Sequence, residues 1–200
     1  RVRVPGGYRD LTIESRSAGV LRLGAAFLEK DAPGLVVDAV SLTGVRYENW
    51  AAVPADHLRA EVVARAPDLI AFQLGLNESD TGVEENYPEL IRRLFTLLRD
   101  ARPLSCLVVG PSDKVEKHAG GYRTLPVIRQ IARLQREAAL AAGCAWFDTQ
   151  AAMGGEAAIF RWYQHQPRLA MGDLTHITVE GGELLGNLLY HDLLLAIAAR

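Results

Sequence analysis

The segment GDLTHIT, residues 172–178, places an aspartate and a histidine three positions apart. Asp173 could accept a hydrogen bond from one imidazole nitrogen of His176 and fix its tautomer, which leaves the other nitrogen to take a proton from a nucleophile. Of the five histidines in the chain, only His176 has an aspartate three residues earlier. The pair could also cap a helix, but its place between the last strand pattern and the C-terminal helical stretch favours a catalytic pair.

Two other segments offer hydrogen-bond donors for a developing oxyanion. Gly44, in SLTGVRYENW, lets the backbone approach a ligand closely and present its N–H group. Asn77, in LGLNESD, follows Gly75 and carries a side-chain amide, a type of donor worth about 3 kcal/mol in acyl transfer. Taken singly, Gly44 also fits a plain turn and Asn77 a helix cap.

Other chemistries lack their sequence motifs. There is no H-E-x-x-H, no Cys/His cluster and no glycine-rich phosphate loop, so we expect neither a metal site nor a cofactor. The net charge of −2 does not predict a nucleic-acid partner. No apolar run reaches the roughly 18 residues that span a bilayer, so we expect no transmembrane segment. Cys106 and Cys144 lie in apolar runs and are interpreted as small core residues.

From about residue 35 onward, apolar runs alternate with helical patterns, which predicts an α/β fold with a parallel sheet covered on both faces. The expected strands are 35–40, 69–74, 105–110 and 144–148, and the expected helices are 54–66, 87–101, 125–143 and 180–199. Ligands of such sheets bind beyond the carboxyl ends of the strands. Residues 1–30 differ, because RVRV and LTI alternate with period two between PGG and SAG turns, which favours antiparallel strands.

In their order, these segments resemble the SGNH (GDSL-type) hydrolases. TG with Gly44, GLNES with Gly75 and Asn77, and DLTHIT with Asp173 and His176 are similar to the second, third and fifth sequence blocks of that family. GPSD at 110–113 and FDTQAAMGGEAA at 147–158 resemble the branch with periplasmic peptidoglycan O-acetylesterases and related carbohydrate acetylesterases. The resemblance covers about residues 30–198.

The resemblance implies a flavodoxin-like three-layer fold and ester hydrolysis through an acyl-enzyme, without a cofactor. It makes His176 the general base and Asp173 its orienting partner, with the Gly44 N–H and the Asn77 side chain in the oxyanion hole. It further implies an acylated carbohydrate as substrate, peptidoglycan among the candidates, and a periplasmic or secreted location.

The first block of the family, a strand followed by Gly-Asp-Ser, is absent from the chain. In one interpretation the serine lies upstream of residue 1, and residues 1–30 are the tail of a β-sandwich inserted before an SGNH-like domain of residues 31–200. In the other, TIESRSAG is a degenerate first block with Ser15 as the nucleophile.

The serine-bearing strand is central in this fold, between the strands expected at 35–40 and 69–74. Because buried backbone groups need hydrogen-bond partners, the missing strand must come from residues 1–17, from upstream sequence or from another chain. Two functional alternatives remain open. One is a non-catalytic carbohydrate-binding or scaffold domain, and the other is a sugar O-acetyltransferase that uses the same residues.

Overall fold

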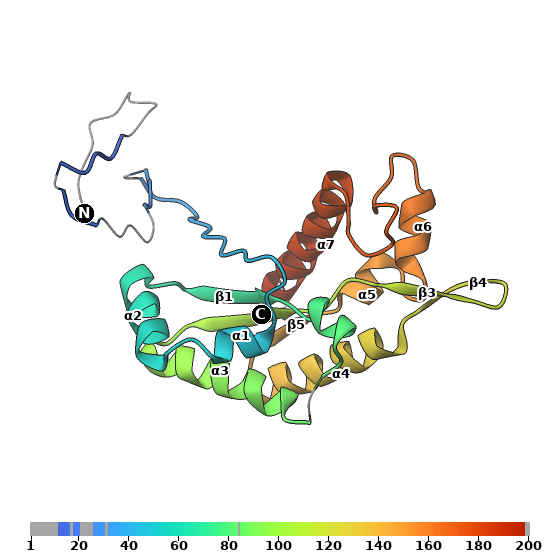
Figure 1. Ribbon diagram of the computed structural model, residues 1–200, viewed down its shortest axis with the longest axis horizontal. Helices are drawn as coiled ribbons and strands as arrows, with labels where there is room; N and C mark the ends of the chain where they lie inside the picture. The colour runs from blue at the N-terminus through green and yellow to red at the C-terminus, as the bar shows by residue number, and fades with distance from the viewer. Residues whose placement is uncertain (1–11, 17, 21–25, 31, 84, 199–200) are drawn as a thin grey trace. The chain divides into compact units, whose positions relative to one another are not determined.

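The computed structural model describes residues 12–16, 18–20, 26–30, 32–83 and 85–198. The chain forms two compact units, Arg1–Ser41 and Leu42–Arg200, and each is described by itself. All helices and strands of the described residues belong to the second unit (Figure 1). In chain order they are α1 (Tyr47–Ala51), α2 (Ala55–Arg65), β1 (Leu69–Gln73), the 3₁₀ helix η1 (Asn77–Asp80), α3 (Tyr87–Ala101), β2 (Ser105–Val109), β3 (Val115–His118), β4 (Gly121–Thr124), α4 (Pro126–Ala141), β5 (Ala145–Phe147), α5 (Thr149–Met153), α6 (Ala158–Gln164) and α7 (Val179–Ala198).

The sheet of the second unit is parallel and has the order β1-β2-β5. β1 pairs with β2 from Leu69↔Ser105 to Gln73↔Val109, and β2 pairs with β5 at Val109↔Phe147. Because the three strands run in one direction, the loops that follow them leave from one edge of the sheet. These loops lead to η1, to the β3–β4 hairpin and to α5.

Helices cover both faces of the sheet, as the strand patterns predict. Val108 of β2 is buried in a cluster with residues of α1 to α4, among them Ile91, Phe95 and Ile131. Its neighbour Val109 points to the other face, where it packs in a second cluster with side chains of α5, α6 and α7. Alternate residues of one strand thus enter two different cores, which is the three-layer arrangement.

The four predicted helices and three of the four predicted strands are confirmed. Cys106 and Cys144 are buried, as expected of core residues, and they also form a disulfide, which was not predicted. This bond joins β2 to the residue before β5, and its two cysteines are 38 positions apart in sequence. No helix of the described residues is both long enough and apolar enough to be a candidate membrane span.

The strand predicted at 35–40 is wrong, because these residues have no regular secondary structure. Their apolar side chains are exposed, with Leu35 at 90% and Val37 at 78%. A lone apolar strand has no partner for its N–H and C=O groups, and the strand expected to lie beside it is not among the described elements. Of the β-rich segment predicted for residues 1–30, the described residues 12–16, 18–20 and 26–30 form no strand, while RVRV lies outside the described residues.

Candidate active site

Asp173 and His176 form a hydrogen-bonded pair in the loop between α6 and α7. Oδ2 of Asp173 lies 2.7 Å from Nδ1 of His176. The other carboxylate oxygen, Oδ1, accepts the backbone N–H groups of Thr175 and His176, each at 3.0 Å. With Nδ1 directed at the carboxylate, Nε2 is the ring nitrogen left to exchange a proton.

The same hydrogen bonds keep Asp173 ionised. The backbone N–H of His176, and next its side chain, lower the pKa of the Asp173 carboxyl from 3.8 to about 2. At neutral pH the carboxylate can therefore stabilise a positive charge on the imidazole. Asp173 and His176 are both substantially exposed, so the pair is open to solvent.

A short antiparallel bridge holds the loop of this pair. Ala170 and Ile177 form the bridge, and the Met171 N–H donates to the His176 carbonyl oxygen at 2.8 Å. Between them, Leu174 has a φ of +54°, and its side chain packs on the core below α7. The histidine thus lies on a loop that is closed by backbone pairing and anchored by a partly buried leucine.

Thr178, at the end of the loop, begins the C-terminal helix. Its Oγ1 accepts the N–H of Gly181 at 3.1 Å and donates to the Arg168 carbonyl at 2.7 Å. The alternative that Asp173 and His176 merely cap α7 is therefore not needed, because Thr178 fills that role.

The two predicted oxyanion donors lie in segments that contact each other, the turn before α1 and the first residue of η1. Gly44 has a φ of +74° in the turn closed by the Val45 N–H and the Leu42 carbonyl. Nδ2 of Asn77 donates to the carbonyl oxygen of Val45 at 2.9 Å. This amide nitrogen carries a second hydrogen, which remains available to a ligand.

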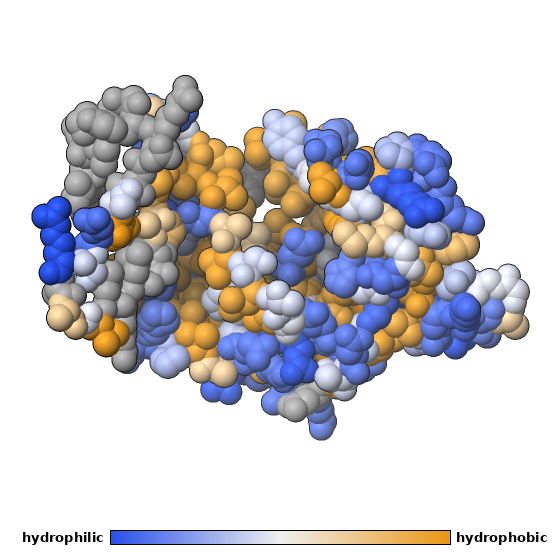
Figure 2. All heavy atoms as spheres, turned by 45° about the horizontal axis from the view of Figure 1, so that its top comes forward, coloured by the Kyte–Doolittle hydropathy of each residue, from blue (hydrophilic) through white to orange (hydrophobic). Residues whose placement is uncertain are grey.

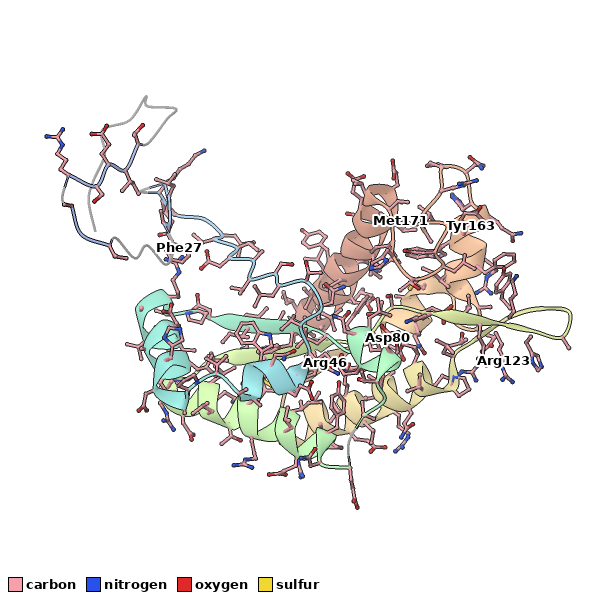
Figure 3. All side chains as sticks on the ribbon, viewed as in Figure 1. Phe27, Arg46, Asp80, Arg123, Tyr163 and Met171 are labelled. Atoms are coloured by element: carbon pink, nitrogen blue, oxygen red, sulfur yellow. A yellow bond between two sulfur atoms is a disulfide. The ribbon has the colours of Figure 1, made fainter. Side chains whose placement is uncertain are left out.

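The loop after β2 contributes a lysine to the same edge. Nζ of Lys114 lies 3.2 Å from Ser79 Oγ and is paired with the carboxylate of Asp80. Figure 3 labels Asp80 on η1 and Arg46 on the neighbouring loop, and Nη1 of Arg46 donates to Thr81 Oγ1 at 2.8 Å. These contacts were not predicted, because lysine and arginine side chains give no pattern in sequence that assigns them a partner.

A buried polar cluster below η1 was also missed. Glu78 is only 4% exposed, and its Oε1 accepts the N–H of Tyr47 at 3.1 Å and the hydroxyl of Tyr87 at 3.4 Å. Burial, and next the charge of Glu78, raise the pKa of both tyrosines, so their hydroxyls stay protonated. Nε2 of Gln135 donates to the Tyr87 oxygen at 2.8 Å and to the Leu74 carbonyl at 3.1 Å.

Gly75 is required at the end of β1. Its φ is +115°, and a Cβ there would lie 2.5 Å from Nε2 of Gln135.

Ser15, the alternative nucleophile, belongs to the first unit and has no regular secondary structure. Among the described residues, no three His, Cys, Asp or Glu side chains are grouped so that they could hold a metal ion.

The fold is shared with solved esterase structures. The structure of a peptidoglycan O-acetylesterase has a TM-score of 0.70 and 19% sequence identity, over 78% of this chain and 45% of that one. An acetylxylan esterase from Geobacillus stearothermophilus has a TM-score of 0.54 and 15% identity, over 74% of this chain and 67% of that one. No family model and no curated protein sequence matches the chain.

The predicted α/β fold with a parallel sheet is therefore confirmed, and these esterase structures share it. At these identities the likeness concerns the fold. The chain spans less than half the length of the peptidoglycan O-acetylesterase structure that it matches.

Proposed function

We propose that this chain is part of a serine ester hydrolase that removes acetyl or other short acyl groups from a polysaccharide, with peptidoglycan as the foremost candidate. The proposal rests on the 2.7 Å contact between Asp173 and Nδ1 of His176. Because the carboxylate binds Nδ1, the other ring nitrogen, Nε2, does not contact it. The turn of Gly44 and the amide of Asn77 offer donors of the kind that ester hydrolysis needs.

In the proposed reaction, Nε2 of His176 takes the proton of a serine hydroxyl as its oxygen attacks the ester carbonyl. The Asp173 carboxylate stabilises the imidazolium that forms. The N–H of Gly44 and the second amide hydrogen of Asn77 stabilise the tetrahedral oxyanion. His176 then returns the proton to the departing sugar oxygen, and water, activated by the same histidine, releases acetate from the acyl-enzyme.

The acetylxylan esterase structures support this assignment of roles. They are structures of catalytic mutants in which a serine, an aspartate or a histidine of that enzyme is replaced by alanine. In that enzyme the aspartate and the histidine are three positions apart, as Asp173 and His176 are here. An ester of a carbohydrate is the substrate class that the names of both neighbours have in common.

The serine comes, in this proposal, on a strand that pairs with the outer edge of β1. Among the described elements β1 pairs only with β2, and Leu69 at that edge is 47% exposed.

Much of α7 is also apolar and exposed, and hydrophobic surface is visible between polar patches in Figure 2. The large exposed apolar side chains of α7 are Val179, Leu184, Tyr190, Leu193, Leu194, Leu195 and Ile197.

An added strand beside β1 would satisfy its unpaired backbone groups, and the segment following it would cover apolar surface. Upstream sequence is our preferred source of this strand. Ser15 within the first unit is the alternative nucleophile, and another chain is a further possible source of the strand.

The Cys106–Cys144 disulfide supports a periplasmic or secreted location, because disulfides persist mainly in oxidising compartments. Peptidoglycan and other extracellular polysaccharides are found in those compartments. Location and substrate class therefore agree with each other in the proposal.

The test is acetate release from O-acetylated peptidoglycan and from acetylxylan by the full-length protein. His176→Ala should lower kcat by about 10²–10⁴-fold, the usual contribution of a general base. His57→Ala is the matched control, since His57 is exposed on α2 and should leave kcat unchanged. Unchanged turnover in His176→Ala would contradict the proposal.

A serine-directed phosphonate probe locates the nucleophile. Labelling within residues 1–41 supports Ser15, labelling upstream of residue 1 supports the added strand, and an unlabelled full-length protein supports a non-catalytic binding domain. Product analysis with a second sugar present distinguishes acetyl transfer from hydrolysis.

A further inference from the structure

Glu78 is a buried carboxylate that the proposed reaction does not use. It lies next to Asn77 in η1 and is 4% exposed. Burying a carboxylate is strongly unfavourable unless hydrogen bonds replace its water. The contacts that Glu78 makes therefore indicate what this buried group does.

The main contact of Glu78 is with the backbone of the opposite loop. Its Oε1 accepts the N–H of Tyr47 at 3.1 Å, although the two residues are 31 positions apart. Tyr47 is the first residue of α1, so its N–H has no partner within the helix. Glu78 thus satisfies the start of α1 from a different segment of the chain.

Asn77 and Glu78 both form hydrogen bonds to the backbone of the same short segment. Asn77 binds the carbonyl of Val45, while Glu78 binds the N–H of Tyr47 two residues later. An exposed third link runs from Arg46 to Thr81. The turn that contains Gly44 is therefore tied to η1 by consecutive side chains.

We propose that Glu78 is a positioning residue of the oxyanion site: its carboxylate holds the Gly44–Tyr47 segment in register with Asn77. This inference rests on the proposed function. Oxyanion donors contribute most when they are fixed before the reaction begins, so a loose Gly44 turn would weaken transition-state stabilisation more than substrate binding.

The hydroxyl contact beneath Glu78, at 3.4 Å, is longer than the 3.1 Å bond to the Tyr47 N–H and links the cluster to the helices of this face. Tyr87 of α3 donates to Oε1, and Gln135 of α4 donates to Tyr87. Gln135 also binds the Leu74 carbonyl, next to Gly75. The oxyanion loops are thereby connected to the two longest helices on that face of the sheet.

The experiment compares Glu78→Met with Glu78→Gln in the full-length protein. Methionine has a similar length but no acceptor oxygen, whereas glutamine keeps an oxygen for the Tyr47 N–H. We expect Glu78→Met to lower kcat by about 10–100-fold with KM within about twofold, and Glu78→Gln to restore most of kcat. If Glu78→Met does not fold, Glu78→Ala replaces it.

Tyr87→Phe is the matched control. It removes the hydroxyl beside Glu78 but leaves the Tyr47 N–H bond, so kcat should stay within about twofold even if the melting temperature falls. A loss of kcat in Tyr87→Phe equal to that in Glu78→Met would overturn the positioning role, because it would trace the effect to the cluster as a whole.

Hydrogen exchange followed by mass spectrometry gives a readout independent of turnover. Peptides covering residues 42–52 should exchange faster in Glu78→Met and at the wild-type rate in Glu78→Gln. Unchanged exchange, or faster exchange with unchanged kcat, overturns the inference. A wild-type protein without esterase activity would instead contradict the proposed function, and the exchange result would still decide whether Glu78 holds the loop.

Discussion

The side-chain amide of Asn77 and the carbonyl oxygen of Val45 are joined by a 2.9 Å hydrogen bond across two loops of the domain. The bond uses one hydrogen of the amide and sets the direction of the other. Asn77 is consequently a fixed donor and not a free surface side chain. This property distinguishes it from an asparagine that only begins a helix.

Asn77→Ala should lower kcat for acetyl ester hydrolysis by about 10²–10³-fold, since it removes a prearranged oxyanion donor. KM should change little, because the donor acts mainly in the transition state. Steady-state kinetics of the full-length protein measure both values. Asn187→Ala, on the exposed surface of α7, is the control and should leave kcat unchanged. Equal kcat for Asn77→Ala and wild type would exclude an oxyanion role.

Asp173 should titrate with a pKa of about 2, well below 3.8, because backbone and side-chain donors of His176 stabilise its charged form. The folded-state pKa is lowered, so the stability that this gives to the loop is complete above pH 3.8. It is lost as the pH falls through about 2. The side chain is half exposed, so this stability is small, at most about 1 kcal/mol.

Carboxyl ¹³C NMR of selectively labelled full-length protein can follow this titration. His176→Ala removes the imidazole but keeps the backbone donors, so the pKa should rise only part of the way to 3.8. A value of 3.8 in the wild type would mean that the pair is not formed in solution.

The Cys106–Cys144 bond should contribute about 3–4 kcal/mol to the free energy of unfolding, the value expected for a loop of this length. Thermal melts with and without a reductant should show a lower melting temperature after reduction. The double variant Cys106→Ala/Cys144→Ala should melt at the lower temperature whether or not the reductant is present. A melting temperature unaffected by reduction would argue against a stabilising role for the disulfide.

Sequence patterns predicted those parts of the fold that depend on local periodicity. The apolar spacing of α3 and α4 marks one buried face, and the continuous burial of Cys106–Val109 in β2 follows from helices on both sides. The strand expected at 35–40 failed because a strand also needs a neighbour, and its apolar residues cannot show whether one is present. Short helices such as α5 span too few turns for a pattern to appear.

The contacts of the candidate site also divide into those that local sequence spacing predicts and those that it does not. Asp173 and His176 are three residues apart, so their contact could be predicted from spacing alone. Glu78 and Tyr47 are 31 residues apart, and glutamate is a residue type usually found on the surface. Nothing local indicates that this carboxylate is buried or that it binds a helix start. Its role could be seen only after the loops were placed in space.

Gly181 should be the least replaceable glycine of the C-terminal helix. A Cβ at this position would lie 2.0 Å from the carbonyl oxygen of Leu169, a backbone atom in the segment that supports the loop of His176. Gly181→Ala should therefore push α7 away from this segment and destabilise the domain by about 1–3 kcal/mol or more.

In the control variant Gly186→Ala the new methyl group meets no atom within 4 Å, so the better helix propensity of alanine should stabilise α7 by about 0.5–1 kcal/mol. Calorimetric melts of the full-length variants should shift in opposite directions, and kcat should fall only in Gly181→Ala, because only that change displaces the loop of His176. Equal melting temperatures for the two variants would show that α7 does not press on Leu169 as the structure has it.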